Sequence, residues 1–198
     1  MKGPDLLKFL LPLLFSTSLA AAQEFDLSEL PEGYTFVSIG QDTRSTVRFL
    51  RQEGATYIFE EVTEYDDGTR ETAAIHTNRA SQTTYWALGA QKRSFAPSDC
   101  GPSLGECTYT WIDSDGTVDM KSVTRLISDI WISDTYFRNE DTWVFWSRDC
   151  TIYDAYGFWY DFVRLYSDGE STFGTRARIG ANRLDDLWQA CDPPDYIS

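Results

Sequence analysis

Two acidic residues, Glu61 and Asp161, are the candidates for catalytic chemistry in this sequence. Glu61 alternates with Tyr57 and Phe59, and Asp161 alternates with Val163. Because successive side chains of a strand point to opposite faces, each acid would share a face with apolar residues. Two carboxyl groups across a cleft can cleave a glycosidic bond. A small secreted glycoside hydrolase using Glu61 and Asp161 is therefore one hypothesis for the function.

A structural ion pair with Arg148 is the competing explanation for Asp161.

Other kinds of catalytic or cofactor chemistry find little support in the sequence. A Ser-His-Asp site would have to use His76, the only histidine, and the chain has no GxSxG motif. We interpret His76 as a surface or half-buried histidine. Phosphate-loop and dinucleotide glycine motifs are absent from the sequence, so no cofactor is expected.

The Asp-Ser-Asp-Gly stretch at residues 113–116 has the composition of a calcium loop. An EF-hand requires an oxygen ligand at its first position, glycine at the sixth and glutamate at the twelfth. With Gly116 at the sixth position, the first and twelfth positions hold Trp111 and Ser122. The stretch is therefore predicted to be a hairpin turn, and no metal site is predicted. A weaker extracellular calcium site is the alternative, built from Asp113, Asp115 and Asp119.

Three Asp-Gly turns have similar surroundings. The segments YTWIDSDGTV and FVRLYSDGES contain Gly116 and Gly169, and VTEYDDGTRE, which contains Gly68, is a looser match. A duplicated hairpin module would explain the similarity. Three independent hairpins that use the same favourable turn would explain it equally well.

Aromatic side chains suggest ligand binding. They make up 15% of the chain, with seven tryptophans. In the segment TWVFWSRDC, Trp143 and Phe145 share one face of a strand while Val144 and Trp146 share the other. Such a strand is either sandwiched between two layers, or one of its faces lines a cavity or an interface. The tryptophans that we expect to contact a ligand are Trp86, Trp146 and Trp159.

The four cysteines predict two disulfides, Cys100–Cys107 and Cys150–Cys191. A zinc site is the rival interpretation, but no CxxC pair occurs and only one histidine is present. The first pair closes a loop rich in glycine and proline. The second pair joins a predicted strand to a predicted helix, as the spacing around Cys191 indicates.

A short C-terminal helix is the one exception to a strand-rich pattern. Leu184, Leu187, Trp188 and Cys191 follow the spacing of one helix face. Cys191 therefore points toward the sheet, which is the physical reason to pair it with Cys150. Two prolines follow and end the helix.

The remainder of the chain predicts an all-β protein. Runs rich in β-branched and aromatic residues alternate with turn residues. The predicted strands are Tyr34–Ile39, Thr46–Arg51, Ala55–Tyr65, Thr69–His76, Thr83–Leu88, Cys107–Ile112, Thr117–Thr124, Leu126–Ser133, Thr135–Asn139, Trp143–Tyr153, Phe158–Tyr166 and Ser171–Ile179. Regular short strands predict an antiparallel sandwich or barrel built from hairpins, with one short C-terminal helix.

The N-terminus predicts export. Residues 1–22 combine a basic start, an apolar core and a run of alanines, as in a cleavable secretory signal. The apolar run within residues 1–22 is too short to span a bilayer. No transmembrane segment is expected in residues 23–198. These residues are predicted to form a single domain that is periplasmic or secreted.

The acidic balance excludes some partners. The whole chain has a formal net charge of −14, whereas nucleic-acid binding needs clustered Lys and Arg. Our leading hypothesis is an exported, non-catalytic binding module for an apolar or carbohydrate ligand, or for an envelope protein. A glycoside hydrolase and a purely structural module are the alternatives.

Overall fold

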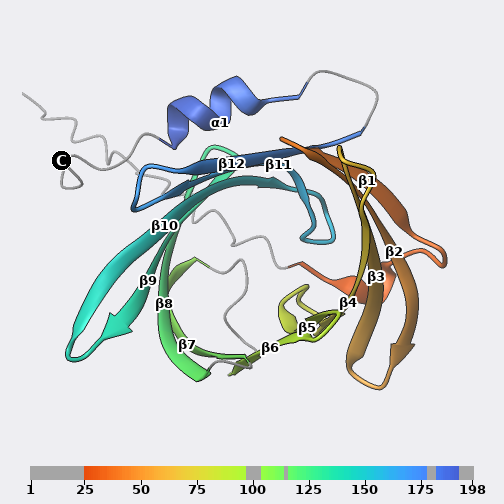
Figure 1. Cartoon of the computed structure of the whole chain (residues 1–198), viewed down its shortest axis with the longest axis horizontal. Coiled ribbons are helices and arrows are strands. Elements are labelled where there is room, and N and C mark those ends of the chain that lie inside the picture. Colours follow the sequence, from red (N-terminus) through yellow and green to blue (C-terminus); the bar gives the residue numbers. More distant parts are fainter. Residues whose placement is uncertain (1–24, 97–103, 114–115, 178–181, 192–198) are drawn as a thin grey trace, which may run out of the picture.

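The computed structural model describes residues 25–96, 104–113, 116–177 and 182–191. In these residues the chain forms twelve antiparallel strands that close into one barrel. Figure 1 shows the barrel with the C-terminal helix α1 lying against its outer surface. The predicted all-β class is confirmed, in the form of a barrel with one short C-terminal helix.

Each strand pairs with its neighbours in sequence, and β1 pairs with β12, so the barrel is an up-and-down meander. The elements are η1 (Leu27–Glu29), β1 (Thr35–Gly40), β2 (Thr43–Glu53), β3 (Thr56–Tyr65), β4 (Arg70–Thr77), β5 (Thr83–Leu88), β6 (Gln91–Ala96), β7 (Gly105–Asp113), β8 (Gly116–Ile127), β9 (Ile130–Asn139), β10 (Thr142–Tyr153), β11 (Trp159–Tyr166), β12 (Ser171–Arg176) and α1 (Leu184–Ala190). The β1–β2 connection and every second connection after it lie at one end, called here the turn end. The remaining connections lie at the opposite end, called here the plug end.

The first and last strands are joined by a buried polar network. Ser38 of β1 pairs with Arg176 of β12 in the antiparallel register. Arg176 donates a hydrogen bond to the Asp154 carboxylate at 2.7 Å, and the Tyr34 hydroxyl donates to the same carboxylate at 2.6 Å. Burial, together with the hydrogen bond to Asp154, raises the pKa of Tyr34 well above its ordinary value. The network therefore ties β1 and β12 to the β10–β11 connection at the plug end.

The segment that precedes β1 enters the barrel and gives the plug end its name. Leu27 of η1 is buried, and its backbone N–H donates to the Arg79 carbonyl at 2.8 Å. Arg79 also pairs with Asp26 at 2.6 Å. Phe25 packs against Trp131 on the inner face of β9, with ring centroids 5.6 Å apart. This segment and the β4–β5 connection therefore hold one another in place.

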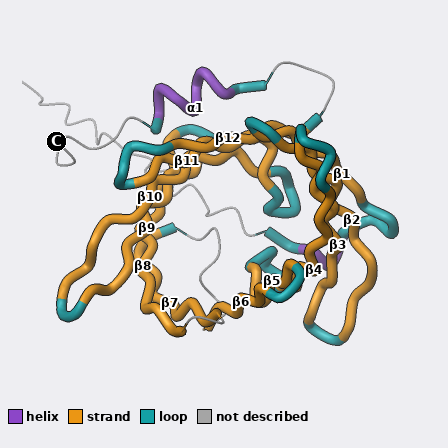
Figure 2. The backbone as a smooth tube through the Cα atoms, in the orientation of Figure 1, coloured by secondary structure: helices purple, strands orange, loops and turns teal. Residues whose placement is uncertain are grey.

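One apolar core lies inside the barrel, next to the plug. Tyr57 and Phe59 alternate along β3 and are both buried, as their spacing predicts. They pack with Leu27, Phe36 and Val47 in one cluster. Figure 2 shows the β10–β11 connection folded toward the inside of the ring. It carries aromatic side chains into this core.

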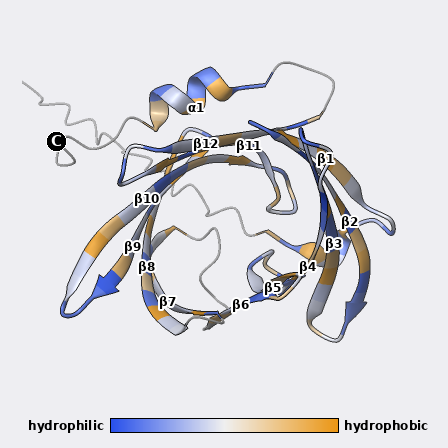
Figure 3. Ribbon diagram, viewed as in Figure 1, coloured by the Kyte–Doolittle hydropathy of each residue, from blue (hydrophilic) through white to orange (hydrophobic). Residues whose placement is uncertain are grey.

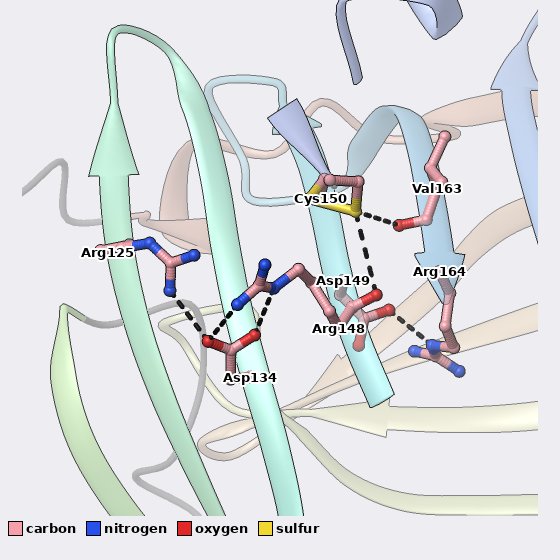
Figure 4. Close-up of a disulfide and its surroundings, with 8 residues drawn as sticks. Arg125, Asp134, Arg148, Asp149, Cys150, Val163 and Arg164 are labelled. Carbon is pink, nitrogen blue, oxygen red and sulfur yellow. Dashed lines mark hydrogen bonds and ion pairs between the residues drawn. A yellow bond between two sulfur atoms is a disulfide. The ribbon is translucent and has the colours of Figure 1, made fainter. Parts of the chain in front are cut away.

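A second apolar core lies outside the barrel, beneath α1. Leu187 and Cys191 are fully buried against β9, β10 and β11, whereas Trp188 keeps 38% of its surface exposed. The Cys150–Cys191 disulfide is confirmed, with the two Cα atoms 5.6 Å apart (Figure 4). The predicted Cys100–Cys107 disulfide falls partly outside the described residues, because Cys100 is not among them. Figure 3 shows both hydrophobic and hydrophilic residues along α1, as expected of a helix with one buried face.

A buried ion-pair cluster lies beside the disulfide on the outer face (Figure 4). Arg148 donates to the two oxygens of Asp134 at 2.5 and 2.9 Å, and Arg125 donates to Asp134 at 2.9 Å. Burial alone would raise the pKa of Asp134, but the hydrogen bonds and charges of the two arginines outweigh it and lower that pKa. Arg148 is therefore paired with Asp134, and the competing account of Asp161 as a partner of Arg148 stays a prediction.

Most strand ends lie within about three residues of the prediction, and two differences are larger. β6 was not predicted from the sequence. The predicted strands Leu126–Ser133 and Thr135–Asn139 are wrong in their division, because β9 runs without a break from Ile130 to Asn139. The true turn follows Ile127, and its residue Ser128 adopts a φ of 58°.

Two of the three Asp-Gly turns have the same geometry. Tyr65 and Tyr166 each donate a backbone hydrogen bond across the turn, at 2.9 Å in both cases. Gly68 and Gly169 take φ values of 84° and 90°, which glycine adopts without strain. Both turns lie at the turn end. Duplication and independent choice of one favourable turn each predict this likeness, so duplication stays a hypothesis.

The predicted secretory signal, residues 1–22, lies outside the described residues. Within the described ranges, neither η1 nor α1 has the length and hydrophobicity of a membrane-crossing helix.

Candidate functional site

The barrel lumen contains a cavity of about 530 Å³. Each of the twelve strands contributes at least one lining side chain, and the β4–β5 and β10–β11 connections close part of the plug end. Small-molecule sites are typically concave spaces of about 300–1,000 Å³ with aromatic walls and a few polar groups. The cavity has the size of such a site.

One side of the cavity is aromatic. Phe158, from the β10–β11 connection, lies 5.6 Å from Phe36, measured between ring centroids. Trp159 packs edge-on against Phe162 at 4.8 Å and against Phe36 at 6.3 Å. The rings come from β1, β11 and the connection before it. They form a continuous apolar surface that faces the lumen.

The opposite side of the cavity carries hydroxyl groups. Ser122 and Thr135 lie within hydrogen-bond distance at 3.3 Å, and Thr124 donates to Ser133 at 2.9 Å. These residues occupy alternate positions of β8 and β9, so the pleat of the two strands turns them all inward. Each hydroxyl has one donor and two acceptor positions, so the wall can bond to a ligand while its own pairs remain.

An ion pair spans β10 and β11 within this wall. Arg164 donates to Asp149 at 2.5 Å, and both side chains line the cavity. The nearby negative charge of Asp149 raises the pKa of Arg164 further above its ordinary value. Burial raises the pKa of Tyr153 to about 12 and also raises the pKa of Tyr109. At neutral pH these tyrosines are therefore neutral hydrogen-bonding groups.

A tryptophan cluster lies toward the turn end. The Arg93 guanidinium stacks between Trp86 and Trp111, at 5.0 and 4.8 Å from the two ring centroids. Trp111 contacts Trp146 at 5.7 Å, although β7 and β10 are not neighbours in the sheet. Trp146 in turn packs against Tyr166 at 6.0 Å. The cluster thus links strands from opposite sides of the lumen.

The structure separates the three predicted ligand-binding tryptophans into two places. Trp159 lines the cavity. Trp86 and Trp146 belong to the tryptophan cluster and are bridged by Trp111, which the sequence analysis did not select. The β10 strand does carry aromatic residues on both faces. Trp146 faces Trp111, while the Lys121 ammonium lies 5.3 Å from the ring of Trp143.

Glu61 and Asp161 are not brought together. Glu61 lines the cavity from β3. Asp161 is fully buried on the outer side of β11, where it accepts hydrogen bonds from the Thr175 hydroxyl at 2.5 Å and from the backbone N–H of Arg183 at 3.1 Å. Arg183 immediately precedes α1, on the outside of the barrel. The described residues therefore offer no common cleft for this pair of acids, and the hydrolase hypothesis gains no support.

Metal and nucleophile chemistry also gain no support from the described ranges. No group of three or more His, Cys, Asp or Glu side chains comes together there as a metal site. The His76 ring packs against Tyr85 at 4.9 Å on β4 and β5. Asp115, one of the residues of the alternative calcium site, lies outside the described residues.

Several cavity residues were missed by sequence reasoning. Phe36 lies within one predicted strand and Phe158 begins another, and only the closure of the barrel brings them together. Asp149 and Arg164 lie within two predicted strands that follow one another along the chain. Opposite charges inside two such strands are a usable signal for a buried pair. The hydroxyl wall gives a weaker signal, because Ser and Thr are equally common on solvated strand faces.

Comparisons with family models, with curated proteins and with solved structures found no match to this chain.

Proposed function

We propose that this protein is an exported binding module that holds a small amphipathic organic molecule in the barrel lumen. The observation that carries the proposal is the division of the cavity wall into an aromatic side and a hydroxyl side. Rings such as Phe158 and Trp159 offer an apolar surface, while Thr124 and Ser133 offer hydrogen bonds. A molecule with one apolar and one polar part fits both sides.

Two observations support export, to the periplasm or the exterior. The first is the secretory character of residues 1–22. The second is the Cys150–Cys191 disulfide, since such bonds persist in oxidising compartments.

Binding can be tested with N-phenylnaphthylamine, a neutral amphipathic dye whose fluorescence increases in apolar surroundings. We expect saturable binding to the folded protein. Trp159→Leu should weaken binding roughly two- to twelvefold, because an aromatic contact contributes about 0.5–1.5 kcal/mol. Trp188→Leu is the matched control, since Trp188 lies on α1 outside the barrel and should leave the affinity unchanged.

A second variant tests the site by obstructing the lumen. Ser133→Phe adds a ring to the hydroxyl wall and should block binding by filling the lumen. The melting temperature of each variant shows whether it is folded. Absence of saturable binding to the wild-type protein, or equal losses in Trp159→Leu and Trp188→Leu, would contradict the proposal.

A further inference from the structure

Glu61 is an acidic side chain in an apolar part of the lumen. On β3 it pairs in register with Val47 of β2 and Ala73 of β4, and both neighbours are buried. The three side chains point to the same face, and Glu61 and Val47 line the cavity. The carboxyl group therefore faces the ligand space.

No cation of the described chain neutralises Glu61. Its sequence neighbour Glu60 faces outward and pairs with Arg48 at 3.0 Å, whereas the ion pairs found among the described residues do not include Glu61. The cations on the inner faces of these strands are already engaged, and Arg176 pairs with Asp154. Arg164 bonds to Asp149, and Arg93 is held between two tryptophans. Glu61 thus gives this part of the lumen a negative charge without a counter-ion of its own.

The surroundings of Glu61 disfavour that charge in the empty site. Burial raises the pKa of the Glu61 carboxyl, and a hydrogen bond with Ser45 offsets this only in part. A half-buried acid without a counter-ion costs stability, so its presence in a cavity is typical of a functional group. A positive charge that entered the cavity would restore the ionised form.

Aromatic rings lie beside the carboxyl group. Phe59 is two residues away on the same face of β3, and its ring centroid lies 5.1 Å from that of Phe158. Phe158 in turn contacts Phe36. Organic cations bind to ring faces through cation–π attraction, and a carboxylate supplies the opposite charge. Metal sites usually gather several His, Cys, Asp or Glu side chains, and the described residues bring no three of these together.

We propose that the lumenal ligand carries an ammonium group, with Glu61 as its counter-ion and Phe59 and Phe158 as its aromatic wall. This inference rests on the proposed lumenal binding function and specifies the class of ligand. The apolar part of the ligand would lie along Trp159 and Phe162, and its polar substituents would face the hydroxyl wall.

The test compares two molecules of the same shape, benzyltrimethylammonium and the uncharged neopentylbenzene, in their ability to displace N-phenylnaphthylamine. We expect the cation to bind about tenfold or more tightly than the neutral molecule, because its positive charge is attracted to the Glu61 carboxylate and to the faces of the aromatic rings. Glu61→Gln should remove about that factor for the cation and leave the neutral molecule unaffected. Glu60→Gln, on the outer face of the same strand, should change neither affinity.

The outcomes separate the two proposals. If the dye binds but the neutral molecule displaces it as well as the cation does, or if Glu61→Gln leaves the cation's affinity intact, the ammonium inference is wrong while lumenal binding stands. If the dye does not bind to the wild-type protein, lumenal binding fails and the ammonium inference fails with it.

Discussion

Phe59 and Phe158 meet inside the barrel, with ring centroids 5.1 Å apart and planes inclined at 67°. Phe59 comes from β3, and Phe158 comes from the β10–β11 connection. In the sheet, β3 and β11 lie on opposite sides of the β1–β12 pair that closes the barrel. Their contact holds this connection inside the lumen, next to Glu61. The same contact therefore belongs both to the apolar core and to the proposed binding wall.

Removal of the Phe158 ring should affect stability and binding together. Phe158→Ala is expected to cost about 3 kcal/mol of unfolding free energy, at the low end for phenylalanine because the side chain is only partly buried. Dye affinity should fall as well. Urea denaturation and dye titration measure the two effects, and Phe158→Leu should recover most of the stability. Unchanged dye binding in a folded Phe158→Ala protein would remove this residue from the site.

The Cys150–Cys191 disulfide should be a major source of stability. Its sequence separation of 41 residues gives about 4 kcal/mol in the loop-entropy model. The Cys150→Ala/Cys191→Ala protein should therefore unfold at a lower urea concentration, and a reductant should destabilise the wild-type form more than the variant. Dye binding to the folded variant should persist, because the disulfide lies outside the barrel. A variant with wild-type stability would contradict the expected effect.

Asp134 should stabilise the protein in a pH-dependent way. Asp134→Ala removes the carboxylate that accepts two hydrogen bonds from the buried Arg148, which is expected to cost about 3–5 kcal/mol at neutral pH. The pKa of Asp134 is lowered in the folded protein, so its contribution is present above the unfolded-state value of 3.8 and is lost as the pH falls through the folded value. The difference between wild type and variant should therefore shrink in acid.

The control for Asp134 is Glu60→Gln, which breaks the more exposed pair with Arg48 and should cost less than about 1 kcal/mol. Unfolding curves at neutral and acidic pH test both variants. Equal costs for the two substitutions would contradict the assignment of Asp134 as a buried ionic centre.

Glu61 should affect the pH dependence of stability in the opposite direction to Asp134. Its folded-state pKa is raised above the ordinary value of 4.5, so the folded protein favours the protonated acid and loses stability as the pH rises through the folded value. Glu61→Gln should therefore be more stable than wild type at neutral pH, and the two should converge below about the ordinary value of 4.5. Thermal unfolding across this range measures the difference. A wild-type protein that is more stable than the variant at neutral pH would contradict this sign.

The fold class was predictable because local patterns agree with the final structure. Tyr57 and Phe59 alternate on β3 and are buried together, and Leu187 and Cys191 share one face of α1. The helix face also predicted the partner of Cys150 correctly. Alternation and helix spacing depend only on neighbours along the chain, so the sequence contains them directly.

The errors in the predicted strand division arose where polar residues are buried within a strand. Ser133 and Asp134 resemble a turn in the sequence, but Ser133 faces the lumen and Asp134 pairs with Arg148. The true turn contains Ser128, without glycine or proline to mark it. The opposite faces of Glu61 and Asp161 depend on how the sheet closes, which local patterns do not specify. The contact of Phe59 with Phe158 was beyond prediction for the same reason.

The most direct test of ammonium binding in the lumen is a titration of isotope-labelled protein with benzyltrimethylammonium, followed by the NMR shifts of backbone amides. The account predicts saturable shifts concentrated around Glu61 on β3 and around Phe158 and Trp159, with little change along α1. Shifts confined to α1 and the outer faces of its neighbouring strands, or no saturable shifts at all, would contradict it.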